Sequence, residues 1–234
     1  MDTFRFEPGF GREDYLRVQI KRSDAKLGYC RVSMVDAIGI VGLIRELPGW
    51  TPGPTLCLGT RSGREIDLLR IAQWSSPIHR ALVQRLEIRR RGFNSLMPSL
   101  EAIGRSQLPD RGDHACIGIE LNPSCARQDV WIGSFDDYPD EFAGKFQLVF
   151  SNSFDQALEP APAAKEWSRL LRPGGVMVLQ FDSRTPPTFT DPVGNITAEG
   201  IIDEFKDLRV AGFLTFRDGF QPEGIVLQAP PSQT

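Results

Sequence analysis

Short apolar runs alternate with helix-like stretches through most of the chain. The runs at 55–58, 116–119, 146–152 and 176–179 are each bounded by glycine, proline or asparagine. Such continuous apolar runs are typical of strands that are covered on both faces of a sheet. Because the runs alternate with stretches of helical spacing, the pattern predicts an α/β fold with a doubly wound, mostly parallel sheet.

The helical stretches have recognisable ends. Apolar positions recur with helical spacing in 32–47, 65–72 and 163–171, and Pro48-Gly49 ends the first stretch. Thr197 is a candidate N-cap for a helix over 197–208. The runs 209–216 and 224–228 follow with a connection too short for a helical crossover. We therefore expect the parallel sheet to end in an antiparallel hairpin.

The first thirty residues have no such pattern. Residues 1–30 are polar and predict an irregular arm, followed by the helix over 32–47. The predicted organisation is an N-terminal arm and helix at 1–50, a main domain at 51–229 and a frayed tail at 230–234. Within the main domain, a helical insertion over 74–112 is expected, with one helix from Ser76-Pro77 to near Gly92 and a second through 96–103.

Composition limits the classes of protein. Apolar residues make up 41% of 234 residues, which is enough for a large core. No run is long and apolar enough to cross a bilayer, and the start lacks the order of a secretion signal, so we expect a cytoplasmic protein without a membrane partner. The four cysteines form no CxxC pair and the two histidines lie far apart. This arrangement favours buried free thiols and predicts no metal site.

Charge is unevenly distributed. Residues 1–110 hold 17 Lys and Arg against 12 Asp and Glu, whereas residues 111–234 hold 10 against 18. There is no long basic tract, so nucleic acid is disfavoured as a partner. Five arginines lie between 80 and 91. They form either a solvated helix face or a contact surface for an anionic substrate or a second subunit, and a homodimer would use this insertion or the N-terminal arm.

The stretch TLCLGTRSGRE, residues 55–65, carries the first chemical signal. It predicts a strand that enters a glycine turn and opens a helix, an arrangement that often binds nucleotide-like cofactors. Glu120 ends the next predicted strand, a place where doubly wound nucleotide-binding sheets often have an acidic residue. Gly63 and Glu120 are 57 positions apart instead of the usual about 20, which predicts an insertion of about 35 residues between them.

The order of these features resembles the class I S-adenosylmethionine-dependent methyltransferases, in particular the small-molecule, type 11-like group. RLLRPGG matches that group's Leu-Xaa-Pro-Gly-Gly signature, and the resemblance covers roughly 53–229. It implies a seven-stranded, Rossmann-like sheet and S-adenosyl-L-methionine as cofactor, with S-adenosyl-L-homocysteine as product. It also implies that the acceptor contacts variable segments, here 1–50, 74–112 and 182–198.

The resemblance also implies where the cofactor binds. The glycine turn would pass beneath its methionine part, Glu120 would lie at the ribose, whose diol can donate two hydrogen bonds to a carboxylate, the stretch VWIGSFDDYP would cover the adenine, and Asn152 would lie beside the sulfonium. The implied cofactor-binding residues are Gly59, Thr60, Arg61, Gly63, Glu65, Glu120, Asn122, Ser134, Phe135 and Asn152.

Three positions depart from the family pattern. Ser134 replaces an aspartate common at the adenine, so that contact passes to Ser134, to the backbone of Phe135 or to Asp136. Cys57 stands where an acid often orients the turn, and Arg61 stands at the usual middle glycine. Arg61 either pairs with the cofactor carboxylate or closes the pocket.

The expected reaction is O-methylation of a hydroxyl on a small molecule or saccharide by in-line attack on the sulfonium methyl. Asp155 is the candidate catalytic base, and an N-cap role is the alternative for this residue. Two other functions stay open: a non-catalytic module that kept the fold, and an RNA methyltransferase that uses the basic front half. A nicotinamide-dependent oxidoreductase fits poorly, because its glycine pattern and acid spacing are not met.

Overall fold

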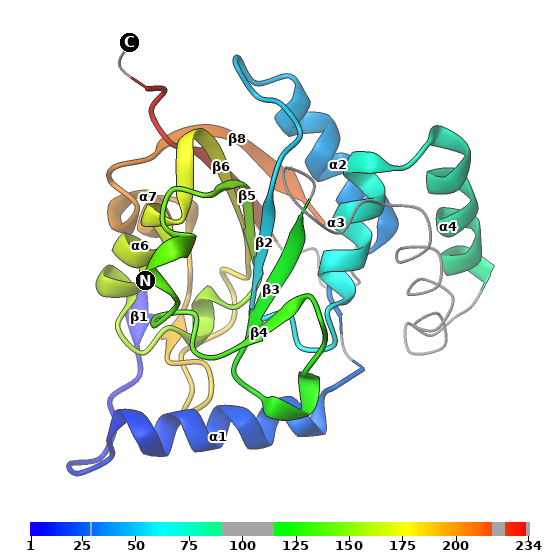
Figure 1. Ribbon diagram of the computed structural model, residues 1–234. Coiled ribbons are helices and arrows are strands. Elements are labelled where there is room, and N and C mark those ends of the chain that lie inside the picture. Colours follow the sequence, from blue (N-terminus) through cyan, green and yellow to red (C-terminus); the bar gives the residue numbers. More distant parts are fainter. Residues whose placement is uncertain (29, 90–114, 217–222, 233–234) are drawn as a thin grey trace.

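A central sheet organises the chain in the computed structural model, which describes residues 1–28, 30–89, 115–216 and 223–232 (Figure 1). The strand order in this seven-stranded sheet is β4-β3-β2-β5-β6-β9-β8. The strands are β2 (Thr55–Leu58), β3 (Cys116–Glu120), β4 (Val130–Ile132), β5 (Phe146–Ser151), β6 (Leu171–Phe181), β8 (Arg209–Thr215) and β9 (Glu223–Gln228).

The pairing of the strands confirms the predicted topology. β2 pairs in parallel with β3 on one side and with β5 on the other, and β4 and β6 extend the parallel part. β9 pairs antiparallel with both β6 and β8. The sheet is therefore mostly parallel and ends in the expected antiparallel hairpin, whose turn at 217–222 lies outside the described residues.

Alternate residues along the strands face two separate cores. On one face, Val176 and Val178 pack with the buried residues of α2 (Met34–Arg45) and α3 (Arg64–Trp74). On the other face, Met177 and Leu179 pack with α6 (Pro160–Arg169) and α7 (Ala198–Glu204). This period of two places helices on both faces of the sheet, as a doubly wound fold requires.

Local signals explain where the helices begin. The Ser33 side chain caps α2 and accepts a hydrogen bond from the Asp36 N–H, while the Asp36 carboxylate accepts from the Ser33 N–H at 2.9 Å. Thr197 caps α7 by accepting from the Gly200 N–H at 3.1 Å, as predicted. α6 begins at Pro160, three positions before the predicted start, because proline is well tolerated in the first turn of a helix.

The N-terminal arm is helical, which corrects the prediction of an irregular segment over 1–30. α1 spans Arg12–Ala25, and its buried residues are Tyr15, Gln19 and Ser23. These residues are four positions apart, so one face of the helix is buried, but that face is polar and gives no apolar period. The short strand β1 (Asp2–Thr3) also pairs antiparallel with β7 (Val193–Gly194) and joins the start of the chain to the 182–198 segment.

The insertion begins as predicted. α4 spans Pro77–Arg89 and follows α3 directly. The second predicted helix, through 96–103, lies outside the described residues. Three short 3-10 turns complete the described elements: η3 (Pro123–Cys125), η4 (Asp140–Phe142) and η5 (Phe154–Gln156). Within the described ranges, no helix combines the length and the apolar character that a membrane span needs.

Candidate active site

The glycine turn joins β2 to α3 in a left-handed backbone conformation. Gly59, Arg61 and Gly63 have φ values of 72°, 47° and 75°. A Cβ at Gly59 would lie 2.4 Å from the Ser153 Oγ, and one at Gly63 would lie 2.5 Å from the Arg127 Nη1. Both ends of the turn therefore require glycine. Arg61 holds a conformation that costs an ordinary residue about 1 kcal/mol or more, and such strain is common at functional sites.

A buried ionic cluster supports the turn from behind. Arg127 donates from Nη1 to the Ser62 carbonyl at 2.8 Å and from Nη2 to the Asp67 Oδ1 at 2.9 Å. Arg70 donates to the Asp129 Oδ2 at 2.9 Å. Burial raises the pKa of Asp67, and the neighbouring guanidinium groups of Arg127 and Arg70 oppose that rise. The cluster fixes the position of the Ser62 carbonyl and thereby the shape of the turn.

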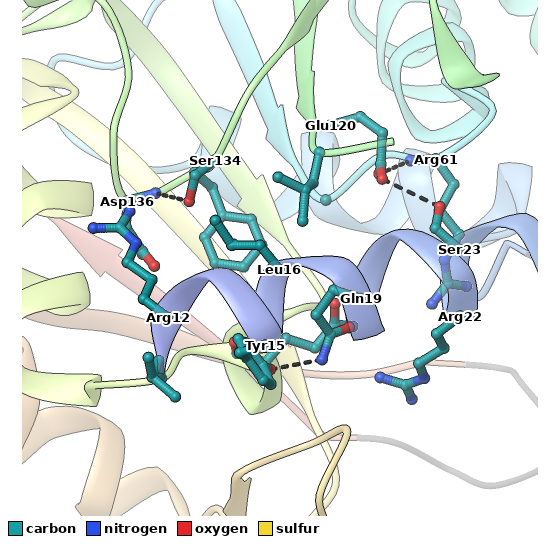
Figure 2. Close-up of a pocket in the computed structure, with 15 residues that line it drawn as sticks. Arg12, Tyr15, Leu16, Gln19, Arg22, Ser23, Arg61, Glu120, Ser134 and Asp136 are labelled. Carbon is teal, nitrogen blue, oxygen red and sulfur yellow. Dashed lines mark hydrogen bonds between the residues drawn. The ribbon is translucent and has the colours of Figure 1, made fainter. Parts of the chain in front are cut away.

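Glu120 lies at the carboxyl end of β3, directly beside this turn. The Arg61 N–H donates to its Oε2 at 2.7 Å, and the Asn122 N–H donates to its Oε1 at 3.2 Å. The Ser23 hydroxyl of α1 also donates to Oε1 at 3.2 Å (Figure 2). A carboxylate has about four acceptor positions, so the described residues use three and leave one.

Glu120 and Arg61 line a cavity of about 640 Å³, including its mouth. Figure 2 shows α1 lying across this cavity, opposite the strand ends. The lining combines α1, the glycine turn, the end of β3, the segment 134–136 and the residues after η5. The lining residues are Arg12, Tyr15, Leu16, Gln19, Arg22, Ser23, Gly59, Arg61, Glu120, Leu121, Ser134, Phe135, Asp136, Gln156 and Leu158.

All three residues considered for the adenine contact lie at this cavity. The Ser134 Oγ accepts a hydrogen bond from the Asp136 N–H at 3.3 Å, and the Phe135 carbonyl accepts from the Trp167 indole at 3.1 Å. The Asp136 Oδ1 is buried and has no hydrogen-bond partner among the residues that the structure describes. Burial raises the pKa of Asp136 to about 6. Of the three residues, Asp136 is therefore the one whose side chain has a buried acceptor oxygen without a hydrogen-bond partner in the described residues.

Besides Asn152, which lines a second cavity, four of the predicted cofactor residues do not line this cavity: Thr60, Gly63, Glu65 and Asn122. Thr60 and Glu65 are buried, and the Thr60 hydroxyl donates to the Glu65 Oε2 at 3.4 Å. The Asn122 side chain donates to the Asp24 Oδ1 at 2.8 Å and accepts from the Ser124 N–H at 2.9 Å. These contacts shape the turn and the end of β3, and direct contact with a cofactor stays a prediction for all four.

A second cavity of about 500 Å³, including its mouth, contains the two remaining predicted residues, Asn152 and Asp155. Arg22 lines both cavities, so they meet at α1. The second cavity is built mainly by the N-terminal arm and the 182–198 segment, in line with the variable segments expected to hold an acceptor. Its lining residues are Arg22, Arg31, Asn152, Asp155, Gln180, Phe181, Asp182, Thr185, Asp191, Val193 and Ile196.

Asp155 lies inside the 3-10 turn η5, whose N-cap position is occupied by Ser153. The N-cap position of the following helix α6 is occupied by Glu159, so the alternative role of Asp155 as an N-cap is wrong. Its Oδ1 is buried and has no hydrogen-bond partner within the described part of the chain. Burial and the nearby Asp191 raise the pKa of Asp155 to about 7, against the opposing effect of three arginines. A carboxyl group with this pKa can accept a proton near neutral pH.

Sequence reasoning missed α1, which is held between the two cavities by side chains on its buried face. The Tyr15 hydroxyl donates to the Gln156 carbonyl at 2.9 Å, and the Gln19 amide donates to the Thr190 carbonyl at 2.6 Å. Arg22 donates to the Asp191 Oδ2 at 2.7 Å. The only available signal is the spacing of polar residues in YLRVQIKRSD, which hydrophobic periodicity does not detect.

The cysteines are free and buried, as predicted. Burial raises the pKa of Cys116 to about 11, and those of Cys30 and Cys57 rise well above the ordinary value. Thiols in this state are poor nucleophiles and poor metal ligands. Across residues 1–28, 30–89, 115–216 and 223–232, no group of three or more His, Cys, Asp or Glu is arranged to hold a metal ion.

No protein-family model matches this sequence, and no curated protein matches it either. Solved structures do match the fold. 1,6-Didemethyltoxoflavin-N1-methyltransferase from Burkholderia thailandensis, with bound 1,6-didemethyltoxoflavin and S-adenosylhomocysteine, aligns with a TM-score of 0.60 and 11% identity. That alignment covers 98% of this chain and 93% of the other.

Two further structures show the range of this fold. The N-methyltransferase NodS from Bradyrhizobium japonicum WM9, bound to S-adenosylhomocysteine, aligns with a TM-score of 0.54 and 12% identity over 91% of this chain and 98% of its own. The [4+2]-cyclase SpnF aligns with a TM-score of 0.52 and 10% identity over 99% of this chain and 100% of its own. The chain therefore has the fold of the class I S-adenosylmethionine-dependent methyltransferases.

Proposed function

We propose that this protein is an S-adenosylmethionine-dependent methyltransferase that methylates a hydroxyl group of a small molecule or saccharide. The observation that carries the proposal is the position of Glu120. Glu120 is the last residue of the parallel strand β3, lies beside the left-handed glycine turn and lines the first cavity. Ligands of open α/β sheets bind at this edge, beyond the carboxyl ends of the strands. The two methyltransferase structures with a similar fold contain S-adenosylhomocysteine, which supports the same cofactor here.

The residues at the first cavity have the chemistry that this cofactor needs. Glu120 can accept hydrogen bonds from the ribose hydroxyls once one of its present donors moves away. The unsatisfied Oδ1 of Asp136 can accept from the adenine amino group. The guanidinium of Arg61 can pair with the carboxylate of the methionine part. When bound, the cofactor supplies a methyl group activated by a sulfonium.

Asp155 supports a hydroxyl as the acceptor. A hydroxyl must lose its proton during methylation, so a base nearby contributes to the rate. Asp155 lines the second cavity, its Oδ1 has no partner among the described residues, and its pKa is about 7. In this proposal, Asp155 accepts the proton of the acceptor hydroxyl, while Asn152 lies beside it in the same cavity.

The test is the formation of S-adenosylhomocysteine with hydroxyl acceptors, measured for the parent and for Asp155→Asn. The proposal expects turnover with a hydroxyl acceptor and a loss of about 100-fold or more in the variant. Cofactor binding without turnover on any acceptor would favour a non-catalytic module, a role compatible with the fold because the SpnF structure is that of a cyclase. Turnover on RNA alone would favour the RNA methyltransferase. The homodimer stays a prediction.

A further inference from the structure

Gln180 is a buried amide without a partner. It lies near the end of β6 and is 3% exposed. Both its Nε2 and its Oε1 are buried and lack a hydrogen-bond partner among the residues that the structure describes. A buried polar group that makes no hydrogen bond destabilises the fold, so such groups call for an explanation.

Among the described residues, no neighbour in the sheet forms a hydrogen bond with this amide. The residue directly opposite Gln180 on β9 is Gly224, which has no side chain to offer as a partner. Gln180 instead lines the second cavity, together with Asp155, whose Oδ1 is also buried and without a partner in the described residues. Through Gln180 and Asp155, the cavity therefore offers an occupant one amide donor group and two acceptor atoms that have no partner among the described residues.

The charges at the cavity argue against an anionic occupant. Three carboxyl groups line it, those of Asp155, Asp182 and Asp191, against the two guanidinium groups of Arg22 and Arg31. Arg22 is already paired with Asp191, with an Nη2 to Oδ2 distance of 2.7 Å. A phosphate or carboxylate would find no surplus of positive charge here, and pairing its charge with Arg22 would require breaking that contact. An uncharged polar molecule fits the lining better.

We propose that the second cavity binds an uncharged acceptor with neighbouring hydroxyl groups, such as a glycoside, and that Gln180 recognises its hydroxyl pair. The Gln180 Nε2 donates to one hydroxyl and its Oε1 accepts from the next, while the Asp155 Oδ1 accepts from a third, the reacting hydroxyl. The role of that third hydroxyl rests on the proposed function, whereas the recognition of the pair by Gln180 needs no methyl transfer. Gln180 is thus a specificity-determining residue.

The proposal is tested by binding. A panel of neutral methyl glycosides, the matching uronic acids and sugar phosphates, and single-deoxy glycosides is titrated into the protein in the presence of S-adenosylhomocysteine. We expect at least one neutral glycoside to bind better than its anionic counterparts. Gln180→Leu, which removes both hydrogen bonds at a similar volume, should weaken that binding about tenfold or more. Gln128→Leu, at an exposed position, is the matched control and should bind like the parent.

The deoxy glycosides separate recognition from a merely structural role. If Gln180 contacts the hydroxyl pair, a deoxy glycoside that lacks a contacted hydroxyl should bind weakly to the parent. The same deoxy glycoside should bind equally weakly to Gln180→Leu, because the contact is already missing. Gln180→Leu should also be at least as thermally stable as the parent, because it removes a buried amide that has no partner among the described residues. Gln180→Met serves as a second variant of similar size if the leucine variant does not fold.

The proposal would be overturned by preferential binding of the anionic compounds, or by neutral glycoside binding that is unchanged in both Gln180 variants. Failure to bind any neutral glycoside at millimolar concentration would also overturn it. Glycoside binding that depends on Gln180 without formation of S-adenosylhomocysteine would support this inference while refuting the proposed function. The two failures are therefore distinguishable.

Discussion

The Ser23 hydroxyl donates a hydrogen bond to the Glu120 Oε1 at 3.2 Å and joins α1 to the end of β3. The two residues are 97 positions apart in the sequence. Together with two backbone N–H donors, Ser23 leaves Glu120 one acceptor position out of about four. A ribose diol needs two positions, so one donor must move. Ser23 is the side-chain donor of the three and lies on a separate helix, so it is the donor we expect to move.

Ser23→Ala removes this competing donor. We expect the variant to bind S-adenosylhomocysteine about 2- to 10-fold more tightly, because the ligand no longer displaces a hydrogen bond of about 1 kcal/mol. Calorimetric titration measures the change. Ser168→Ala removes a hydroxyl that donates to the Ala164 carbonyl in α6 and should leave the affinity unchanged. Weaker binding in Ser23→Ala would mean that the hydroxyl contacts the ligand instead of competing with it.

Arg61→Gly decides between the two roles of Arg61. Glycine adopts the φ of 47° without strain, so the free energy of unfolding should change by less than about 1 kcal/mol. If the guanidinium pairs with the cofactor carboxylate, affinity should fall about tenfold or more. Arg61→Lys keeps the charge but not the two-pronged geometry and should lie between the two. An increase in affinity for Arg61→Gly would show that Arg61 closes the pocket.

Gly63→Ala tests the support behind the turn. The new Cβ would lie 2.5 Å from the Arg127 Nη1 and would disturb its contacts with Ser62 and Asp67. We expect a loss of about 2 kcal/mol or more in the free energy of unfolding, measured by urea denaturation. Gly49→Ala is the control, because Gly49 has a similar φ of 74° and open space around it. Equal losses in the two variants would show that the packing against Arg127 contributes nothing.

The pH dependence of turnover tests Asp155. Its pKa of about 7 means that the base form appears as pH rises through neutrality, so the rate should rise up to about pH 8 and then level off. Asp155→Asn should lack this dependence. Because the pKa is higher in the folded than in the unfolded state, the favourable contribution of Asp155 to stability is complete below about pH 4 and is lost towards pH 7. Asp155→Asn should therefore be more stable than the parent at pH 8.

A flat pH profile in the parent would contradict the assignment of Asp155 as base. The thermal melting temperature at pH 4 and pH 8, measured for both proteins, provides a readout that does not depend on turnover. An Asp155→Asn variant that is less stable than the parent at pH 8 would contradict the raised pKa.

The strands and the glycine turn could be predicted from the sequence because both depend on local patterns. The run at 146–151 is buried along its whole length, as expected for a strand covered on both faces, and a turn between Gly59 and Gly63 needs left-handed backbone at its ends. The terminal hairpin followed from the short connection after 209–216. Each of these signals lies within a few neighbouring residues.

The parts that could not be predicted depend on contacts between distant residues. α1 buries Tyr15, Gln19 and Ser23, whose side chains form hydrogen bonds with Gln156, Thr190 and Glu120, so its buried face lacks the apolar period by which helices are recognised. The ion pair of Arg127 and Asp67 joins positions 60 residues apart and buries charges that a local pattern assigns to the surface. Gln180 in β6 likewise has no local signal, because its partner would be a ligand.

Glu120→Gln tests the claim that the cavity beneath α1 binds S-adenosylmethionine through the carboxylate at the end of β3. Calorimetric titration with S-adenosylhomocysteine is carried out on the parent, on Glu120→Gln and on Glu141→Gln, an exposed control. We predict binding to the parent and to the control, and a loss of about tenfold or more in Glu120→Gln. No binding to the parent, or equal binding to all three proteins, would contradict the claim.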